Sequence, residues 1–344
     1  MPWSLIGAEG AKRALEGMLA SGRLPHAILL TGPSGCGKYT LARDLAMAVN
    51  CEAPGPPGSP CGECLPCRKI LAGTHPDIVT IAPKGKTARL AIDDVRSVRD
   101  ALTFRPFEGR TKAALVRGAD SFTDESGGAL LKTLEEPSPD TLIVLTALAS
   151  SAVMSTLVSR CVHFRIPPLP RPEILKALAA RRGMTGPQAE LLAGLSGGAL
   201  GKALMTDPEI AKSFREAVDA VFSRPKGPAR LLQGMRCAAG MAADYGALKS
   251  VDEGQDGFGP ADWLELAELS LRLWWRDAAV LGASGDDGLL DGPAPSPALR
   301  AFAGELKAGD LPVFEEACRR MSDNVRRFVK AELVFDNFWA TVLE

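Results

Sequence analysis

The pattern of apolar and polar positions divides the chain into two parts. Up to Ile166, short apolar runs alternate with amphipathic helical patterns. The runs predict strands at 26–31, 78–82, 112–116, 141–146 and 161–166. The patterns between them predict helices at 38–50, 93–102 and 124–135. Strands that alternate with helices indicate parallel βαβ units, so we expect an α/β domain with a parallel sheet.

The second part of the chain carries helical patterns only. The prolines within 167–170 must end the last strand, because proline cannot donate to a sheet ladder. Two short helices are expected after them, at 173–181 and 187–195, and a third opens at Gly197-Gly198. The pattern therefore predicts an α/β domain at 1–168 followed by a small helical lid at 169–207.

A larger helical domain is expected at 208–344. Its clearest helical patterns lie at 261–281 and 311–343. Between them, the glycine- and proline-rich stretch 282–297 indicates a mobile loop or linker. The chain contains no internal repeat.

Composition and charge exclude several classes of protein. A hydrophobic fraction of 46% and a charged fraction of 24% exclude a disordered chain, a fibrous protein and a coiled-coil rod. The formal net charge of -1 provides no bulk positive field, so any contact with DNA must come from a local patch or a complex. The longest nearly apolar run, 142–153, is shorter than the ~20 residues that span a bilayer. With no visible secretory signal, we expect a cytoplasmic protein without a membrane partner.

Residues 32–38, Gly-Pro-Ser-Gly-Cys-Gly-Lys, have the spacing and setting of a phosphate-binding loop. They follow an apolar strand and open a helix. The glycines Gly32, Gly35 and Gly37 let backbone N–H groups point at phosphate oxygens, and Lys38 would reach the outer phosphates. This stretch predicts a P-loop fold.

Two features that ATP hydrolysis requires are altered. The residue after the loop lysine should be Ser or Thr, whose hydroxyl binds magnesium, but it is Tyr39. Thr40 comes one residue late, which turns its hydroxyl about 100° around the helix. An acidic pair should follow the strand at 112–116 to hold the metal and polarise water, but Arg117 and Gly118 stand there.

Asp120 is the acid that remains near this strand, and we interpret it as a cap that precedes a helix. Two interpretations of the loop stay open. It binds ATP weakly at Gly32, Gly35, Gly37, Lys38 and Thr40, or it serves only as structure. In neither case do we expect the chain to hydrolyse ATP on its own.

Four of the eight cysteines are clustered, at Cys51, Cys61, Cys64 and Cys67. Thiolates at this tight spacing favour tetrahedral zinc, and four protein ligands leave no open position, so the zinc is structural. The alternative is four free cysteines in a loop. His75 follows the cluster and could replace a ligand, although a position in a turn before Pro76 suits it better.

A P-loop followed by a zinc module resembles the clamp-loader subunits of bacterial DNA polymerase III. The segment 21–27, Ser-Gly-Arg-Leu-Pro-His-Ala, resembles that family ahead of the first strand. The stretch 129–137, Ala-Leu-Leu-Lys-Thr-Leu-Glu-Glu-Pro, and Ser159-Arg160-Cys161 match its internal motifs. The resemblance covers about residues 5 to 170. It implies an AAA+ module with a helical lid and a helical collar domain.

The resemblance also implies partners, namely the tau/gamma and delta subunits, with the sliding clamp and primed DNA reached through the complex. Two family members are candidates. The tau/gamma type is the ATPase motor, and the delta-prime type is a stationary subunit with degraded ATPase residues. Tyr39, Arg117 and Gly118 favour the delta-prime type, and so does Gly201, which stands where family motors carry a nucleotide-sensing arginine.

In this family the arginine that matches Arg160 projects into the ATP site of the neighbouring subunit. The resemblance therefore implies that Arg160 is an arginine finger that acts in trans. The plain alternative is a surface salt bridge worth under ~1 kcal/mol. A third function, a zinc-dependent nucleic-acid-binding module, is disfavoured by the net charge of -1.

Overall fold

The computed structural model describes residues 3–55, 58–83, 89–249, 260–326 and 330–343. They form two compact units. The first comprises Met1–Leu169 with Ala199–Gly201, and the second comprises Pro170–Gly198 with Lys202–Glu344. The finer division into a lid at 169–207 and a collar at 208–344 stays a prediction.

The first unit contains a five-stranded sheet whose order is β2-β3-β4-β1-β5 and whose pairs are all parallel. Its strands are β1 (Ala27–Thr31), β2 (Ile78–Ile81), β3 (Lys112–Val116), β4 (Thr141–Ala147) and β5 (Val162–Arg165). Each lies within one residue of its predicted bounds. The expected α/β fold with a parallel sheet is therefore confirmed.

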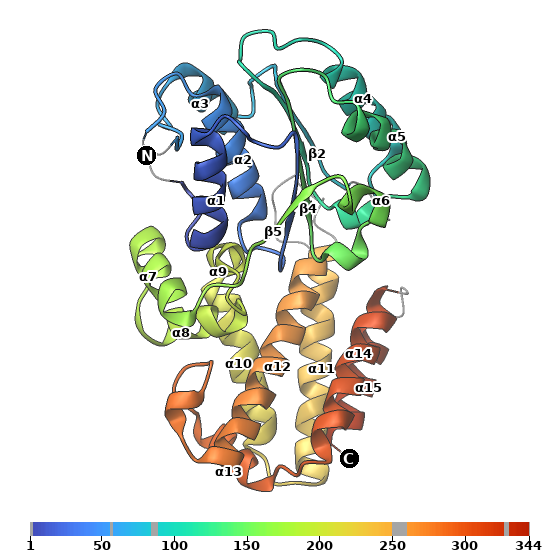
Figure 1. Ribbon diagram of the computed structural model, residues 1–344. Helices are drawn as coiled ribbons and strands as arrows, with labels where there is room; N and C mark the ends of the chain where they lie inside the picture. The colour runs from blue at the N-terminus through green and yellow to red at the C-terminus, as the bar shows by residue number, and fades with distance from the viewer. Residues whose placement is uncertain (1–2, 56–57, 84–88, 250–259, 327–329, 344) are drawn as a thin grey trace. The chain divides into compact units, whose positions relative to one another are not determined.

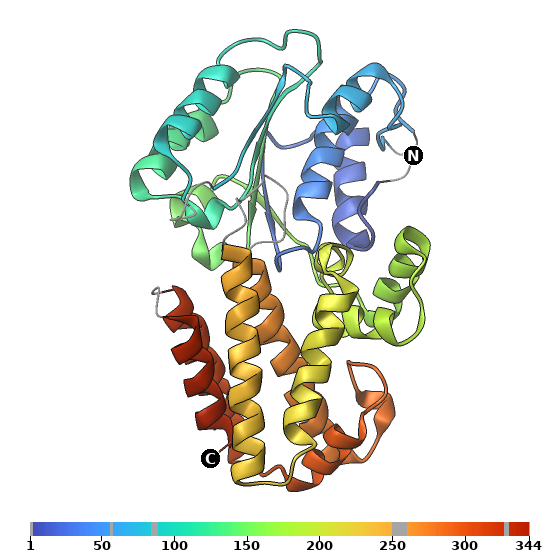
Figure 2. The ribbon, with the colours of Figure 1, turned by 180° about the vertical axis from the view of Figure 1, so that it is seen from behind.

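Helices cover both faces of this sheet (Figures 1 and 2). One face carries α1 (Glu9–Ala20) and α2 (Lys38–Asn50), and the other carries α4 (Ile92–Leu102), α5 (Asp124–Glu135) and α6 (Ser155–Val158). Because successive strand residues point to opposite faces, Ile28 and Leu30 pack in one core while Ala27 and Leu29 pack in the other. All residues of β1, β3 and β4 are buried, as expected for central parallel strands.

The second unit is helical in its described residues. Its helices are α7 (Arg171–Arg182), α8 (Gly186–Leu195), α9 (Leu200–Met205), α10 (Pro208–Phe222), α11 (Pro228–Lys249), α12 (Pro260–Ser284), α13 (Pro297–Glu305), α14 (Asp310–Arg326) and α15 (Ala331–Leu343). The helical pattern at 311–343 thus comprises two helices. The core is aromatic: Phe222 stacks on Trp274 with ring centroids 4.4 Å apart, and Trp275 stacks on Phe314 at 4.3 Å.

The stretch 282–297 joins two helices as predicted, but its centre is held by hydrogen bonds. The buried carboxylate of Asp277 accepts the backbone N–H groups of Asp291 at 3.0 Å and Gly292 at 2.9 Å. The guanidinium of Arg171 donates to the carbonyl oxygen of Gly292 at 3.0 Å. A buried charge with two N–H donors fixes this loop, which composition alone described as mobile.

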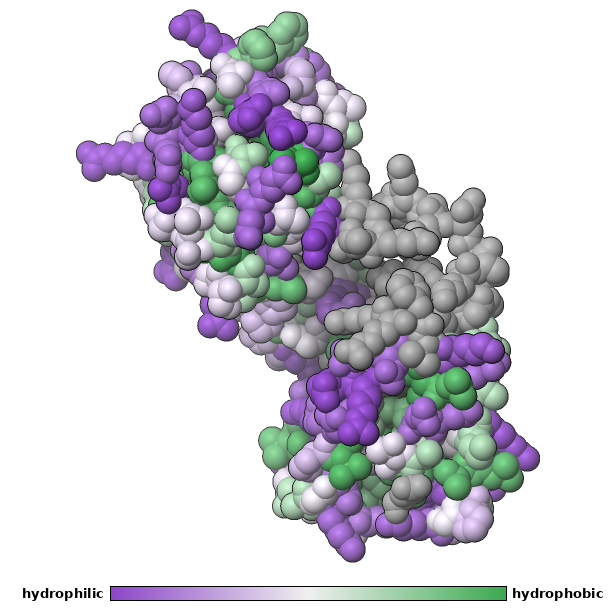
Figure 3. All heavy atoms as spheres, turned by 90° about the vertical axis from the view of Figure 1, so that its right-hand side faces the viewer, coloured by the Kyte–Doolittle hydropathy of each residue, from purple (hydrophilic) through white to green (hydrophobic). Residues whose placement is uncertain are grey.

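The surface is polar. Hydrophilic side chains are interspersed with apolar ones over the described residues on the face seen in Figure 3. Among the helices that the structure describes, none has the length and apolar character needed to cross a bilayer.

Two buried polar side chains fix the turn that leads from α4 into β3. The carboxylate of Asp77, fully buried, accepts the backbone N–H groups of Phe107 at 2.7 Å, Glu108 at 2.9 Å and Gly109 at 2.8 Å. Burial alone would raise the pKa of Asp77, but these donors together with Lys112 lower it below its ordinary value. Asn50, at the end of α2, receives the next two N–H groups of the turn in the same way.

We predict that Asp77→Asn lowers the free energy of unfolding by about 2–3 kcal/mol at pH 7, because an amide cannot accept all three N–H donors. A carboxyl whose pKa is lowered by folding stabilises the protein above its unfolded pKa of 3.8, and this contribution is lost as the pH falls through the folded value. The difference between wild type and variant should therefore shrink below about pH 4. Urea unfolding at several pH values measures it. Asp93→Asn, at a carboxylate that is 88% exposed, is the control and should change little.

Candidate functional site

The phosphate loop lies at the carboxyl end of β1, where ligands bind in open parallel sheets. Gly32, Gly35 and Gly37 all have positive φ angles, of 152°, 77° and 93°. A Cβ atom at position 37 would lie 2.3 Å from the side chain of Leu5, so the turn into α2 requires glycine there. The loop has the backbone form that the sequence predicts, while nucleotide binding to it stays a prediction.

Lys38 is the first residue of α2, and its ammonium lies over its own loop. Nζ donates to the carbonyl oxygens of Gly32 and Pro33, each at 2.7 Å. Thr40 lies two residues further along the helix and is half-buried. The lysine of the candidate phosphate site is thus held by carbonyl oxygens of its own loop.

The two residues that replace the catalytic groups of an ATPase touch each other. The guanidinium carbon of Arg117, which follows β3, lies 4.9 Å from the ring centroid of Tyr39 on α2. This is a cation–π contact. A tyrosine ring and a positive charge thus occupy the side of the loop where a hydroxyl and an acid would hold magnesium. Sequence reasoning flagged both substitutions, but it did not foresee that they form a pair.

Gly118 stands at the second position of the expected acidic pair, and the local structure leaves no room for an acidic side chain there. Its φ angle of 67° lies in the left-handed region, and a Cβ atom there would lie 2.8 Å from Cγ of Pro83. The N–H of Gly118 donates to Oγ1 of Thr146 on β4 at 3.3 Å. A glutamate at this position would strain the backbone and displace the proline.

Asp120 is not the helix cap that the sequence suggested. It lies inside the short 3-10 helix Ala119–Ser121, and α5 begins after Thr123 instead. The Oγ1 of Thr123 accepts the N–H of Ser126 at 3.2 Å, and Ser126 returns a bond to the backbone of Thr123 in a capping box. Threonine and serine at this spacing satisfy the helix start without the aspartate.

Gly201 belongs to the first unit and packs against the phosphate loop. Its N–H donates to the carbonyl oxygen of Gly35 at 2.8 Å, and a Cβ atom at position 201 would lie 2.8 Å from that oxygen. The space for any longer side chain at this position is thus taken by the loop itself. The neighbouring Lys202 pairs with Glu265 of α12.

The four clustered cysteines are brought together as predicted. Their sulfur atoms all lie within 4.8 Å of one another, with Cys51 to Cys64 at 3.9 Å and Cys61 to Cys67 at 4.0 Å. A tetrahedral zinc site with Zn–S bonds of about 2.3 Å places its sulfurs about 3.8 Å apart. The cluster therefore has the dimensions of a metal site and fits four-thiolate coordination.

Backbone N–H groups point at the sulfur atoms. Sγ of Cys61 accepts the N–H groups of Cys64 at 3.2 Å and Glu63 at 3.4 Å, and these donors lower the pKa of Cys61 to about 6. Burial raises the pKa of Cys51 and Cys67. The cluster thus combines a thiol that ionises readily with two that need a cation nearby to become thiolates.

The module around these cysteines has a very small apolar core. Cys51 follows α2 directly, and Cys64 caps the start of α3 (Leu65–Leu71). With the cysteines, Met47 and Ile70 form the buried cluster. His75 is buried in the turn before β2 and lies outside the group of possible metal ligands, in line with its predicted place in a turn.

Arg160 follows α6 and is about one-third exposed. Its Nη2 lies 2.5 Å from Oε1 of Glu135, the last residue of α5. Its Nη1 donates to the carbonyl oxygen of Thr156 at 2.9 Å and to Oγ of Ser159 at 3.3 Å. Cys161 packs against the core of this face of the sheet. The sequence singled out the arginine but gave no sign of its carboxylate partner.

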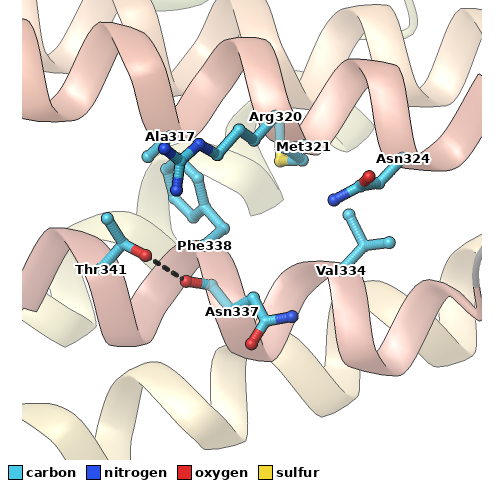
Figure 4. A pocket seen from close by; sticks show the side chains of 8 residues that line it. All are labelled: Ala317, Arg320, Met321, Asn324, Val334, Asn337, Phe338 and Thr341. Carbon is cyan, nitrogen blue, oxygen red and sulfur yellow. Dashed lines mark hydrogen bonds between the residues drawn. The ribbon is translucent and has the colours of Figure 1, made fainter.

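A cavity of about 270 Å³ lies between α14 and α15 (Figure 4). Arg320, Asn324, Asn337 and Phe338 are among its lining residues. Its one charged lining residue, Arg320, pairs with Glu316 on the same helix. The cavity holds no acid–base pair and lies apart in sequence from every candidate residue above.

The first unit is similar in sequence to known proteins. Residues 7–170 match the family model described as DNA polymerase III, delta subunit. The delta′ subunit of DNA polymerase III from Pseudomonas aeruginosa is 37% identical over 142 residues, which cover 41% of this chain and 43% of that protein. The gamma subunit from Buchnera aphidicola is 33% identical over 174 residues, covering 51% of this chain and 47% of that protein. The tau subunit from Escherichia coli is 35% identical over 162 residues, covering 47% of this chain and 25% of that protein.

Two solved structures are also similar. A DNA polymerase III gamma subunit-related protein of Thermotoga maritima is 16% identical with a TM-score of 0.44, over 95% of this chain and 97% of that one. A RuvB mutant of the same organism is 19% identical with a TM-score of 0.41, over 90% and 87%.

The parallel sheet and its phosphate loop define the first unit as a P-loop module. Over residues 7–170, just under half of the chain, the sequence is similar to clamp-loader subunits of bacterial DNA polymerase III. The matched segment spans a quarter to just under half of the length of the curated relatives named above.

We predict that the purified chain carries one equivalent of zinc, which Cys67→Ser removes because it deletes a buried ligand. Thiolates bind the metal and thiols do not, so the affinity should fall as the pH falls. Metal analysis by mass spectrometry measures the content. Cys237→Ser, on α11 outside the cluster, should keep the full equivalent. Full zinc in Cys67→Ser would contradict the assignment.

Proposed function

We propose that the chain is a delta-prime-type subunit of the DNA polymerase III clamp loader. In this role it is a scaffold that does not hydrolyse ATP and that supplies Arg160 to the ATP site of a neighbouring subunit. The observation that carries the proposal is the contact between Tyr39 and Arg117, with guanidinium and ring 4.9 Å apart. It puts a positive charge where a motor needs an acid for its metal ion.

The partners proposed for the chain are tau/gamma-type and delta subunits, and through them the sliding clamp and primed DNA. Relatives named delta′, gamma and tau support a place among these subunits. The four-cysteine cluster is proposed to hold structural zinc, because its four thiolates leave no open coordination position for catalysis.

The alternative is an active motor of the tau/gamma type. Its support is the number of relatives that carry those names. Against it stand the phenol ring of Tyr39, the charge of Arg117 and the lack of room for an acid at Gly118. Each change removes a different contribution to metal binding, so restoring one would not restore hydrolysis.

The isolated chain should show no ATP turnover above a protein-free blank, because Tyr39 stands where a metal-binding hydroxyl is expected, and Arg117 and Gly118 stand where the acidic pair is expected. A coupled assay with magnesium and ATP measures it. Lys38→Ala is the companion variant that shows whether any turnover belongs to this loop. Turnover that Lys38→Ala abolishes would establish the motor alternative instead.

The partial exposure of Arg160 supports the proposed role outside its own subunit. Arg160 lies at the end of α6, partly exposed, on an element anchored by the fully buried Leu157. A guanidinium can contact phosphate oxygens with two parallel N–H bonds and stabilise the charge that develops during phosphoryl transfer. This role is independent of the subunit's own phosphate loop, so it is compatible with the altered Tyr39 and Arg117.

We expect Arg160→Ala to leave folding and assembly unchanged and to slow ATP hydrolysis by the assembled clamp loader about tenfold or more at the neighbouring site. Arg160→Lys should restore little, because an ammonium lacks the planar fork. Steady-state ATPase and clamp-loading assays on reconstituted complexes measure both. Arg181→Ala, at an exposed arginine in the last turn of α7, is the control and should behave as wild type. A wild-type rate for Arg160→Ala would contradict the proposed role.

A further inference from the structure

The guanidinium of Arg160 is held from two directions before any partner is present. Its Nη2 pairs with the carboxylate of Glu135 at 2.5 Å. Its Nη1 donates to the carbonyl oxygen of Thr156 and to the hydroxyl of Ser159. Glu135 lies 25 residues earlier in the chain, so this pair joins two separate elements.

The helix α5, which carries Glu135, is fixed by its packing. Glu135 ends α5, whose buried residues Leu130 and Leu134 pack in the core beneath the sheet. After Glu135 the chain leaves the helix, and Pro137 prevents it from continuing. The end of α5 therefore offers a carboxylate at a defined place.

We infer that Glu135 is a positioning residue for Arg160. This inference rests on the proposed role of Arg160 in a neighbouring ATP site. A free arginine side chain has many rotamers, and part of this freedom is lost when the side chain engages a phosphate. Pairing with Glu135 restricts the side chain in advance, so less freedom is lost in the transition state. Glu135 itself does not touch the substrate.

Ser159 and Thr156 contribute to the same arrangement. Oγ of Ser159 donates to the carbonyl oxygen of Thr156 at 3.1 Å and accepts from Nη1 of Arg160 at 3.3 Å. These bonds fix one terminal nitrogen, while Glu135 fixes the other. An isolated surface ion pair has one such contact and contributes little to stability. Arg160 differs from such a pair because its guanidinium contacts three acceptors.

The test uses the reconstituted clamp loader. Glu135→Gln should lower the turnover number for ATP about threefold to tenfold and leave KM nearly unchanged, because the arginine acts in the transition state. Glu136→Gln, at the adjacent exposed carboxylate, is the matched control and should stay near wild type. In the Arg160→Ala background, Glu135→Gln should have no further effect.

A second measurement needs no partner. In the free subunit, nitrogen-15 spectra of the arginine side chains should show ordered guanidinium N–H signals for Arg160, assigned with Arg160→Lys, that Glu135→Gln broadens or removes. If Arg160→Ala slows turnover but Glu135→Gln does not, the positioning role is overturned and the proposed function stands. If Arg160→Ala has no effect on turnover, the proposed function is overturned and the positioning role with it.

Discussion

The burial of the central strands on both faces is the constraint on which the rest of the first unit depends. Every residue of β1 and β4 is buried, and the two strands pair in parallel register from Ala27 with Ile143 to Thr31 with Ala147. Polar chemistry cannot lie along such strands, so it gathers where they end. The phosphate loop after β1 and Arg117 after β3 therefore face the same edge of the sheet, although about eighty residues separate them in the chain. The order of the strands in the sheet therefore allows Arg117 to contact Tyr39 beside the phosphate loop.

At that edge, the residues of the altered site contact one another. Losing one acid would leave a weakened metal site, but a guanidinium in its place repels a divalent cation at short range. The tyrosine ring gives that guanidinium a partner, which offsets the cost of bringing a positive charge beside a phosphate loop. Gly118 and Gly201 are fixed by contacts so close that longer side chains do not fit. The arrangement is thus self-consistent without catalysis.

The sequence predicted the strands within a residue because they are short, continuous apolar runs bounded by polar turns, and it located the cysteine cluster because ligand spacing is local. It did not indicate α1 or the short α3. It described 282–297 as mobile because composition does not reveal that the buried Asp277 binds its backbone. It gave Asp120 a capping role that Thr123 performs. The sequence did not predict the Glu135–Arg160 pair or the Tyr39–Arg117 contact, because each joins residues that are distant in sequence.

The cysteine module illustrates how a small element depends on its attachment. Among the described residues, the apolar side chains beside the cysteines in its cluster are the buried Met47 and Ile70 and the partly buried Ile78, far too little apolar area to fold independently. Metal coordination would supply the missing free energy, since binding to a site that exists only in the folded state is folding free energy. The module is also tied to the sheet through Lys69 of α3, which pairs with Glu108 at 2.7 Å in the turn that Asp77 fixes. A metal bound by four cysteines would therefore stabilise more than its own loop, because α2, α3 and the turn before β3 meet around it.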